Sequence, residues 1–215
     1  MPYRKRYRKK KRSKQPWYER KYTASQLAKK AWKTAKWLKS VVNVEKKLQD
    51  NTVSTSLSSS PGVTHLTNIQ QGSGQGQRDG TSLKLTSLFV QGQMVMNASA
   101  TSTLIRLVWV IDNQQVGDTT PNYTDIYEAA NTLAPLNKNT LGRFTVLKDM
   151  RIPFSPNGTT NKVFEFYMPL NHHVRYNGTA STDIQKGGLY LVTISNEPTN
   201  TPTIDIRNRV RFVDN

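Results

Sequence analysis

Apolar side chains in the last three quarters of the chain fall in short runs that alternate with polar residues, which is typical of β-strands. The clearest case is residues 202–213, where apolar side chains take even positions and three arginines (Arg207, Arg209 and Arg211) take odd ones. Residues 104–111 are instead apolar on both faces apart from Arg106. This pattern predicts a strand covered on both sides. The apolar phase shifts around Ser87, which predicts a β-bulge.

Eight strands are predicted in succession, and turn dipeptides such as Asp79-Gly80 and Asn157-Gly158 precede or separate some of them. Their ranges are 63–71, 82–97, 102–113, 143–154, 162–170, 172–176, 189–195 and 202–213. A short helix is expected at 125–131. Eight strands with uneven loops predict an all-β fold, a single eight-stranded jelly roll. An immunoglobulin-like sandwich is the alternative, although the cysteines typical of that fold are missing.

The first quarter of the chain has a different pattern and predicts one long helix, at about 23–44. Thr23 and Gln26 fit a capping box, and apolar positions recur every three or four residues from Leu27 onward. The opposite face carries Lys29, Lys33 and Lys36. Three interpretations stay open: the helix packs on sister helices and binds nucleic acid, docks on its own domain, or lies on a membrane surface. We expect an arm over 1–51 and a jelly-roll domain over 52–215.

Charge is distributed as unevenly as the apolar pattern. Residues 1–50 hold eighteen Lys or Arg and three acids, a net charge of +15, whereas residues 51–215 hold thirteen and eleven, a net charge of +2. Such a cationic segment indicates a polyanionic partner, because cations neutralise phosphates and release counterions. The predicted nucleic-acid-binding residues of the first fourteen positions are Arg4, Lys5, Arg6, Arg8, Lys9, Lys10, Lys11, Arg12 and Lys14. A run of this kind also serves as a nuclear-import signal.

The residues of catalytic and metal sites are sparse. Cysteine is absent, and histidine occurs only at His65, His172 and His173. Adjacent residues of a strand point to opposite faces, so His172 and His173 cannot chelate one ion together in regular geometry. No nucleophile–base spacing and no paired-carboxylate motif is present, so we expect no enzyme. No apolar run is long enough to span a membrane, and the basic N-terminus is not of the secretory type.

A second cationic surface is predicted on the body. The first, third, sixth and last strands of a jelly roll share one sheet, and by the numbering above three of these strands carry arginines. The members are Arg106, Arg175, Arg207, Arg209 and Arg211. If their side chains face the same way, the sheet presents a nucleic-acid-binding patch. An ordinary solvated face or a contact with a neighbouring subunit is the alternative.

Several segments, in a kept order and spacing, are similar to those of a known family. They are Gln77-Arg-x-Gly80, Leu88-x-Val-x-Gly92, Ile105-Arg-x-x-Trp109 with Asp112-Asn113, Thr119-Thr-Pro121, and 143–149. Over residues 60–180 the chain resembles the coat proteins of satellite necrosis viruses of plants and the related capsid proteins of small circular single-stranded DNA viruses. The N-terminal run, together with Asn43-Val-Glu-Lys-Lys47, looks more like the DNA virus capsids.

The resemblance implies a capsid protein that assembles with itself into a sixty-subunit T=1 icosahedral shell, with the arms inside on a single-stranded genome. DNA is expected rather than RNA, with the virion, and the host nucleus during assembly, as locations; a host receptor is implied but not identified. In the satellite group calcium bridges subunits, and the matching carboxylates here are Glu45 and Asp214. Both offer the hard oxygen ligands that calcium prefers. The alternatives are a satellite RNA virus coat protein and a non-viral nucleic-acid-binding β-sandwich protein.

Overall fold

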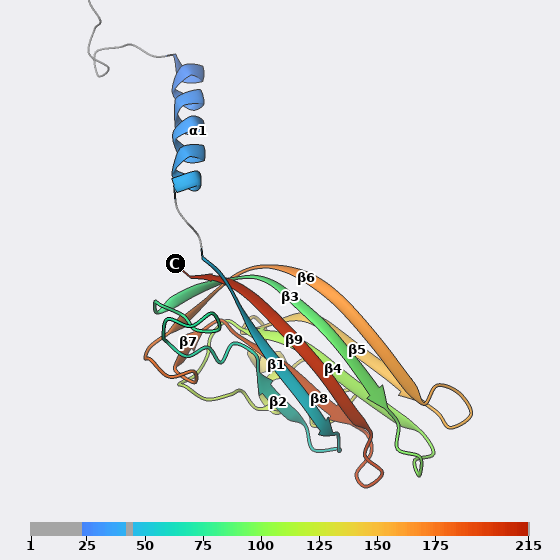
Figure 1. Ribbon diagram of the computed structural model, residues 1–215. Helices are drawn as coiled ribbons and strands as arrows, with labels where there is room; N and C mark the ends of the chain where they lie inside the picture. Colours follow the sequence, from blue (N-terminus) through green and yellow to red (C-terminus); the bar gives the residue numbers. More distant parts are fainter. Residues whose placement is uncertain (1–22, 42–44, 215) are drawn as a thin grey trace, which may run out of the picture. The chain divides into compact units, whose positions relative to one another are not determined.

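The computed structural model describes residues 23–41 and 45–214, which form two separate units: a helix and a β body. Helix α1 spans Ala24–Val41, within the predicted range (Figure 1). The predicted capping box is confirmed, because the Gln26 amide donates to Thr23 Oγ1 at 3.4 Å and the Thr23 amide donates to Gln26 Oε1 at 3.2 Å. No described helix is both long and apolar enough to cross a membrane.

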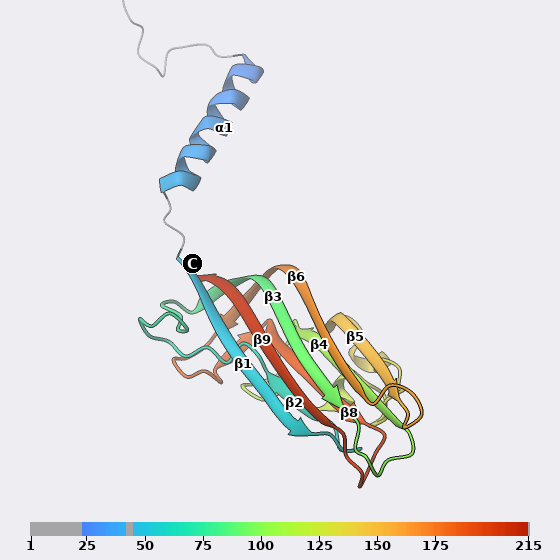
Figure 2. The ribbon, with the colours of Figure 1, turned by 45° about the vertical axis from the view of Figure 1, so that its right-hand side comes forward.

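The β body consists of two curved antiparallel sheets that lie over each other (Figures 1 and 2). The five-stranded sheet contains, in spatial order, β1 (Lys46–Ser56), β9 (Thr203–Asp214), β3 (Ser82–Val95), β6 (Asn161–Tyr176) and β7 (Ile184–Lys186). The four-stranded sheet contains β2 (Gly62–His65), β8 (Gly188–Ser195), β4 (Thr103–Asp112) and β5 (Phe144–Phe154). Two short helices, α2 (Tyr123–Ile126) and the 3-10 helix η2 (Lys138–Thr140), lie between β4 and β5 in the chain.

This strand order is that of a jelly roll, so the predicted fold class is confirmed. If the short β7 is set aside, the first, last, third and sixth strands form one sheet and the other four form the second. Both sheets bury an apolar face, and the shared core contains Trp109, Leu88 and Ile206, each fully buried.

A second apolar cluster covers the outer face of the four-stranded sheet. Val108, Val110 and Val192 pack there against Tyr123 and Tyr127, which belong to the loop between β4 and β5. Strand β4 is therefore buried on both faces, as its uninterrupted apolar sequence predicts.

Several predicted boundaries are wrong, and the most consequential error concerns β1. It begins at Lys46, so the domain boundary expected near residue 52 falls inside a strand. The predicted strand 63–71 is strand only at Gly62–His65, and the predicted strands 162–170 and 172–176 form a single strand, β6. The short β7 was not predicted, and the helix expected at 125–131 forms instead at Tyr123–Ile126. The bulge expected near Ser87 is confirmed, because the register of β3 shifts between Leu85 and Ser87.

Candidate nucleic-acid interface

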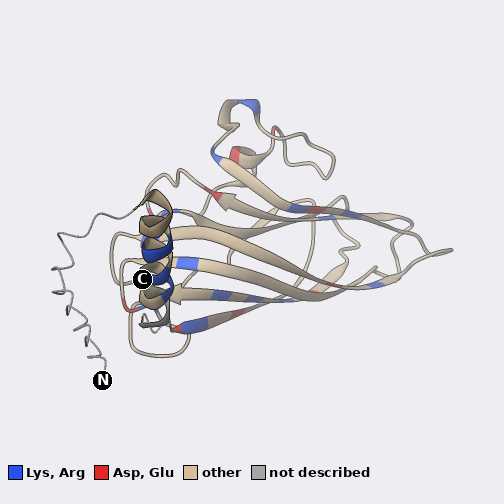
Figure 3. Ribbon diagram, turned by 90° about the horizontal axis from the view of Figure 1, so that it is seen from above, with Lys and Arg blue, Asp and Glu red and all other residues tan. Residues whose placement is uncertain are grey.

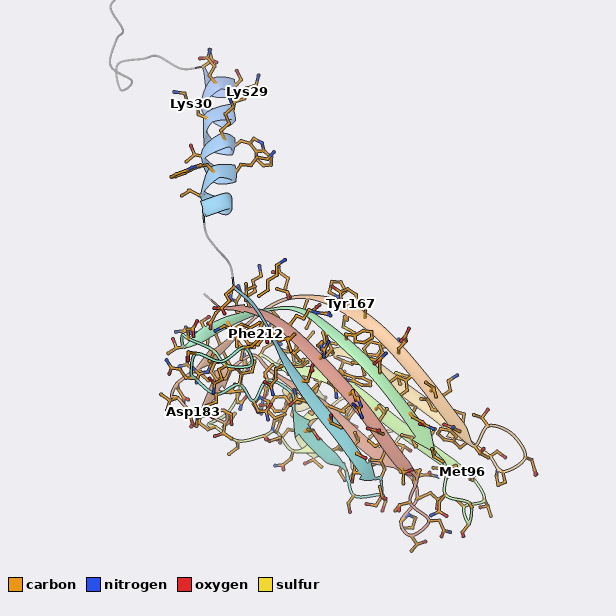
Figure 4. All side chains as sticks on the ribbon, in the orientation of Figure 1. Lys29, Lys30, Met96, Tyr167, Asp183 and Phe212 are labelled. Carbon is orange, nitrogen blue, oxygen red and sulfur yellow. The ribbon has the colours of Figure 1, made fainter. Side chains whose placement is uncertain are left out.

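The cationic face of α1 presents its predicted lysines to solvent. Lys29, Lys33 and Lys36 recur at spacings of four and three along the helix, and all three are exposed (Lys29 is labelled in Figure 4). These spacings bring side chains onto one face of a helix. The apolar stripe is exposed as well, with Leu27 at 53% and Leu38 at 51% of full exposure. The described helix therefore presents one cationic and one uncovered apolar face.

Two tryptophans flank the cationic face of α1, and neither was predicted as a site residue. Trp32 and Trp37 are 64% and 61% exposed, and Lys36 Nζ lies 5.5 Å from the centre of the Trp32 ring. Neither residue belongs to the apolar stripe, because Trp32 and Trp37 border the lysines on either side at 100° per residue. Exposed aromatic rings among cations can stack on unpaired bases. Tryptophan off the apolar face of a basic helix is the signal that could have identified them.

The outer face of the five-stranded sheet carries the second predicted set of cations. Along β9 the side chains of Arg207, Arg209 and Arg211 are exposed, while the residues between them are buried. Figure 3 marks the Lys and Arg positions of the chain in blue on the ribbon. The register places the predicted Arg175 of β6 on the same face, together with three cations that were not predicted: Lys46 on β1, Lys84 on β3 and Lys186 on β7.

Arg209 is neutralised within this face. Its Nε and Nη2 atoms donate to the two carboxylate oxygens of Asp50, both at 2.7 Å. This hydrogen bonding lowers the pKa of Asp50. In the described part of the chain no carboxylate lies within 4 Å of the charged groups of Arg207 and Arg211. Of the three arginines on β9, Arg207 and Arg211 are thus uncompensated and Arg209 is paired.

Arg106 does not belong to this face, and its assignment there is wrong. It lies on β4 in the other sheet, is 2% exposed, and donates to both oxygens of Asp149 at 3.1 and 2.8 Å. Its guanidinium also stacks 3.9 Å from the Tyr127 ring centre. The error follows from missing β1, since β2 to β5 were then counted one position too early; splitting β6 into two predicted strands restored the count after them.

The predicted calcium ligands, Glu45 and Asp214, do lie close together, but a lysine lies between them. Lys47 Nζ is 3.5 Å from Glu45 Oε2, 3.0 Å from Asp79 Oδ2 and 3.6 Å from Asp214 Oδ2. Desolvation lowers the pKa of Lys47, but the Asp79 hydrogen bond and the three negative charges outweigh it and raise the pKa.

Within one chain this arrangement fits an ammonium better than a calcium ion. Calcium needs six to eight oxygen ligands, whereas the side chain of Lys47, 1% exposed, already occupies the space between the carboxylates. Among the residues that the structure describes, no group of three metal-ligating side chains is placed to hold an ion. Calcium at Glu45 and Asp214 stays a prediction.

The sequence segments that are similar to the coat protein family contain residues that stabilise the β body. Buried Arg78 donates to the carbonyls of Ile69 and Gly80, and Trp109 Nε1 donates to Asn208 Oδ1 at 2.9 Å. Arg143 bridges the fully buried Asp112 at 2.9 and 2.7 Å. These contacts satisfy charges and donors that would otherwise be buried unpaired.

No histidine of the described chain belongs to a group of side chains that could hold a metal ion. His65 stacks on Tyr190, and burial lowers its pKa to about 4, which keeps it neutral at physiological pH. His172 contacts the Gly187 carbonyl at 3.1 Å through Nε2. The predicted sites at Arg4 to Lys14 lie outside the described residues.

Comparison with known proteins gives a family. The family model of the satellite tobacco necrosis virus coat protein matches residues 19–215. A search of curated proteins found no match.

Three solved structures show partial similarity to this chain. Desmodium yellow mottle tymovirus is 13% identical over 80% of this chain and 88% of that chain, with a TM-score of 0.37. Dimeric latent PorU from Porphyromonas gingivalis is 8% identical over 80% of this chain and 13% of its own, with a TM-score of 0.39. Infectious bursal disease virus, Gx strain, is 9% identical over 79% and 32%, with a TM-score of 0.27. All three TM-scores are below 0.5, so these structures do not define the fold of this chain.

A jelly roll of this strand order, with a cationic segment before it and a matching family model, defines a viral coat protein. The chain belongs to the satellite tobacco necrosis virus coat protein family. Its role is accordingly structural and not enzymatic, its place is the virion, and family membership implies assembly with further copies into a shell.

Proposed function

We propose that copies of this chain assemble into a closed sixty-subunit T=1 shell and that the cationic N-terminal part packages single-stranded nucleic acid inside it. The observation that supports this proposal is the division of charge between the two parts of the chain. The division of charge is unchanged when the boundary between the two parts is set at the observed start of the β body. Residues 1–44 hold sixteen Lys or Arg and one acid, a net charge of +15.

The magnitude of that charge suits a small genome. Sixty segments of +15 supply roughly 900 positive charges, which balance on the order of a thousand phosphates. The exposed lysines and tryptophans of α1 add phosphate and base contacts of the kind that single-stranded nucleic acid accepts.

The finer question is which nucleic acid is packaged. The similarity of the N-terminal run to capsids of circular DNA viruses favours single-stranded DNA. The family match favours the second candidate, a satellite coat protein that packages RNA. Digestion of material extracted from purified particles with DNase and with RNase in parallel decides between them.

Nuclear entry is a further part of this proposal. The nine cations of residues 1–14 form a run of the type that directs nuclear import. A fluorescent fusion of the full chain is expected to accumulate in host nuclei, and replacement of the nine cations by glutamine is expected to abolish that accumulation. Equal distribution of both fusions would refute nuclear entry.

Deletion of residues 1–14 tests packaging. The expected product is a body that still forms shells but carries no nuclease-protected nucleic acid, measured by the absorbance ratio of sedimented particles. A matched control exchanges every Lys for Arg and every Arg for Lys among the nine cations, which keeps the charge and should keep packaging. Packaging by the deletion variant at the wild-type level would refute the proposal.

A further inference from the structure

A groove crosses the outer face of the five-stranded sheet where β1, β9, β3 and β6 run side by side. Its volume is about 550 Å³, and its lining residues are Lys46, Lys47, Leu48, Thr86, Ser87, Tyr167, Arg211, Phe212 and Val213. The register explains why it is hollow: Arg211 pairs with Ser87, and Ser87 pairs with Pro169 across the sheet. The small side chain of Ser87 at the bulge therefore lies between the larger side chains of Arg211 and Pro169, which leaves a depression in the sheet surface.

The rim of this groove is cationic. Arg211 and Lys46 are both exposed, and neither charged group lies within 4 Å of a carboxylate in the described chain. Lys47 also lines the groove, but its ammonium is held by three carboxylates. None of the lining residues is an acid. The free positive charges at the rim select an anionic occupant.

One side of the groove is aromatic. Tyr167 on β6 lies on the exposed face of the strand and is itself 61% exposed (labelled in Figure 4). Its neighbour across the sheet is Phe89, which in turn pairs with Arg209. An exposed ring beside uncompensated cations combines the two contacts that a nucleotide needs, a surface for base stacking and partners for a phosphate.

We propose that this groove binds a nucleotide unit of single-stranded nucleic acid, with a base stacked on Tyr167 and a phosphate contacted by Arg211 and Lys46. The inference rests on the proposed packaging function and adds a site on the β body to the contacts of the N-terminal part. A second copy of the chain fits the groove less well, because the cationic rim needs an anionic occupant and the body of a second copy carries a net charge of +2 over residues 51–215.

The first test measures affinity with the full chain and an unstructured pyrimidine octanucleotide. Salt is set high enough to weaken the contacts of the N-terminal cations. Tyr167→Ala is expected to weaken binding roughly 5- to 150-fold through loss of stacking, while Tyr167→Phe keeps the affinity. Val163→Ala is the matched control, because Val163 lies on the same face of β6, is 70% exposed and has no part in the groove.

The cations give an independent readout. Arg211→Gln and Lys46→Gln should each reduce the slope of log affinity against log salt by about 0.7, the value per phosphate contact for single strands. Photocrosslinking with the same octanucleotide carrying 5-iodouracil should label the peptide that contains Tyr167.

Wild-type affinity of Tyr167→Ala together with crosslinks confined to other peptides would overturn the proposal. So would a finding that Tyr167→Ala binds the octanucleotide normally but no longer assembles, since the groove would then be a subunit contact. Failure of the packaging proposal has a different signature, namely wild-type packaging without residues 1–14. Thermal unfolding of each variant confirms that the fold is retained.

Discussion

Lys47 offers the sharpest test of how the start of β1 is held in the body. Its ammonium joins carboxylates from three places in the chain: Glu45 just before β1, Asp79 in the turn before β3, and Asp214 at the end of β9. Lys47→Met keeps most of the buried aliphatic length and removes the charge. The three carboxylates would then face one another without a cation.

The expected cost follows from how exposed each partner is. Removing one partner of a fully buried ion pair costs about 3–5 kcal/mol. Glu45 and Asp79 are 63% and 57% exposed, so water re-solvates both of them. Asp214 is only 9% exposed, but it still accepts the backbone N–H groups of Asp79 and Gly80. We therefore expect a loss of about 2 kcal/mol in the free energy of unfolding, chiefly from the lost charged hydrogen bond.

Urea unfolding of unassembled protein, followed by tryptophan fluorescence, measures this loss at constant denaturant slope. Lys46→Met is the control, because Lys46 is the exposed neighbour on the other face of β1, and its cost should stay within about 0.5 kcal/mol. A Lys47→Met variant as stable as the control would refute the reasoning.

The pH dependence of the stability difference between wild type and Lys47→Met tests whether the charge of Lys47 is responsible for that difference. Desolvation opposes the charge of Lys47, but Asp79, Glu45 and Asp214 together raise its pKa above the usual 10.5. A raised pKa means that the contribution is complete below pH 10.5 and is lost as the pH rises through the folded-state pKa. The stability gap between wild type and Lys47→Met should therefore narrow above that pH. A gap that stays constant would show that the charge is not responsible.

Calcium can be tested in the same experiment. If Lys47 is the cation of this cluster, EDTA leaves the wild-type unfolding midpoint and the shell unchanged. A lower midpoint or dissociation of the shell in EDTA would support the predicted calcium contact at Glu45 and Asp214.

Three further outcomes are expected. Arg106→Met should lower the free energy of unfolding by about 2 kcal/mol in urea titrations, because it removes a nearly buried guanidinium and its two hydrogen bonds to Asp149, which keeps its ion pair with Arg151; a cost no greater than that of a surface substitution contradicts this. Asp50→Asn should strengthen oligonucleotide binding and steepen its salt dependence by about 0.7, since Arg209 is released; unchanged binding contradicts it. Burial raises the pKa of Tyr127 to about 12, so stability should fall between pH 10 and 12 as the unfolded state ionises first, and Tyr127→Phe should lessen the fall measured by thermal unfolding.

The elements that the sequence predicted well are those whose side chains follow one strong period. The alternation along β9 and the burial of β4 on both faces could be predicted, because the positions of apolar residues in the sequence directly determine which faces of a strand are buried. The capping box at Thr23 and the bulge near Ser87 depend on neighbours in the chain, and both are confirmed.

Strand β1 could not be predicted in the same way. It lies at the edge of its sheet, and its inward positions include Gln49 and Asn51, so no apolar alternation marks it. Backbone pairing with β9 holds it instead, and this depends on residues far along the chain. The missing strand then shifted the count and placed Arg106 in the wrong sheet.

Only the positive charge of the candidate site could be predicted from the sequence, and not the ion pairs that neutralise part of it. The sequence located Arg207, Arg209 and Arg211 on one face, but it could not show that Asp50 neutralises the middle one. Lys47 gave no signal either, because its partners Asp79 and Asp214 come from distant turns and strand ends. An arginine inside an apolar strand, such as Arg106, is in retrospect the mark of a buried ion pair.

Electron microscopy of the purified full-length protein, with sedimentation of the same sample, tests the central proposal most directly. The charge division and the jelly-roll body together predict uniform closed shells of T=1 size that sediment with nucleic acid inside. A folded protein that remains monomeric with and without nucleic acid, over the full range of salt, would contradict the account.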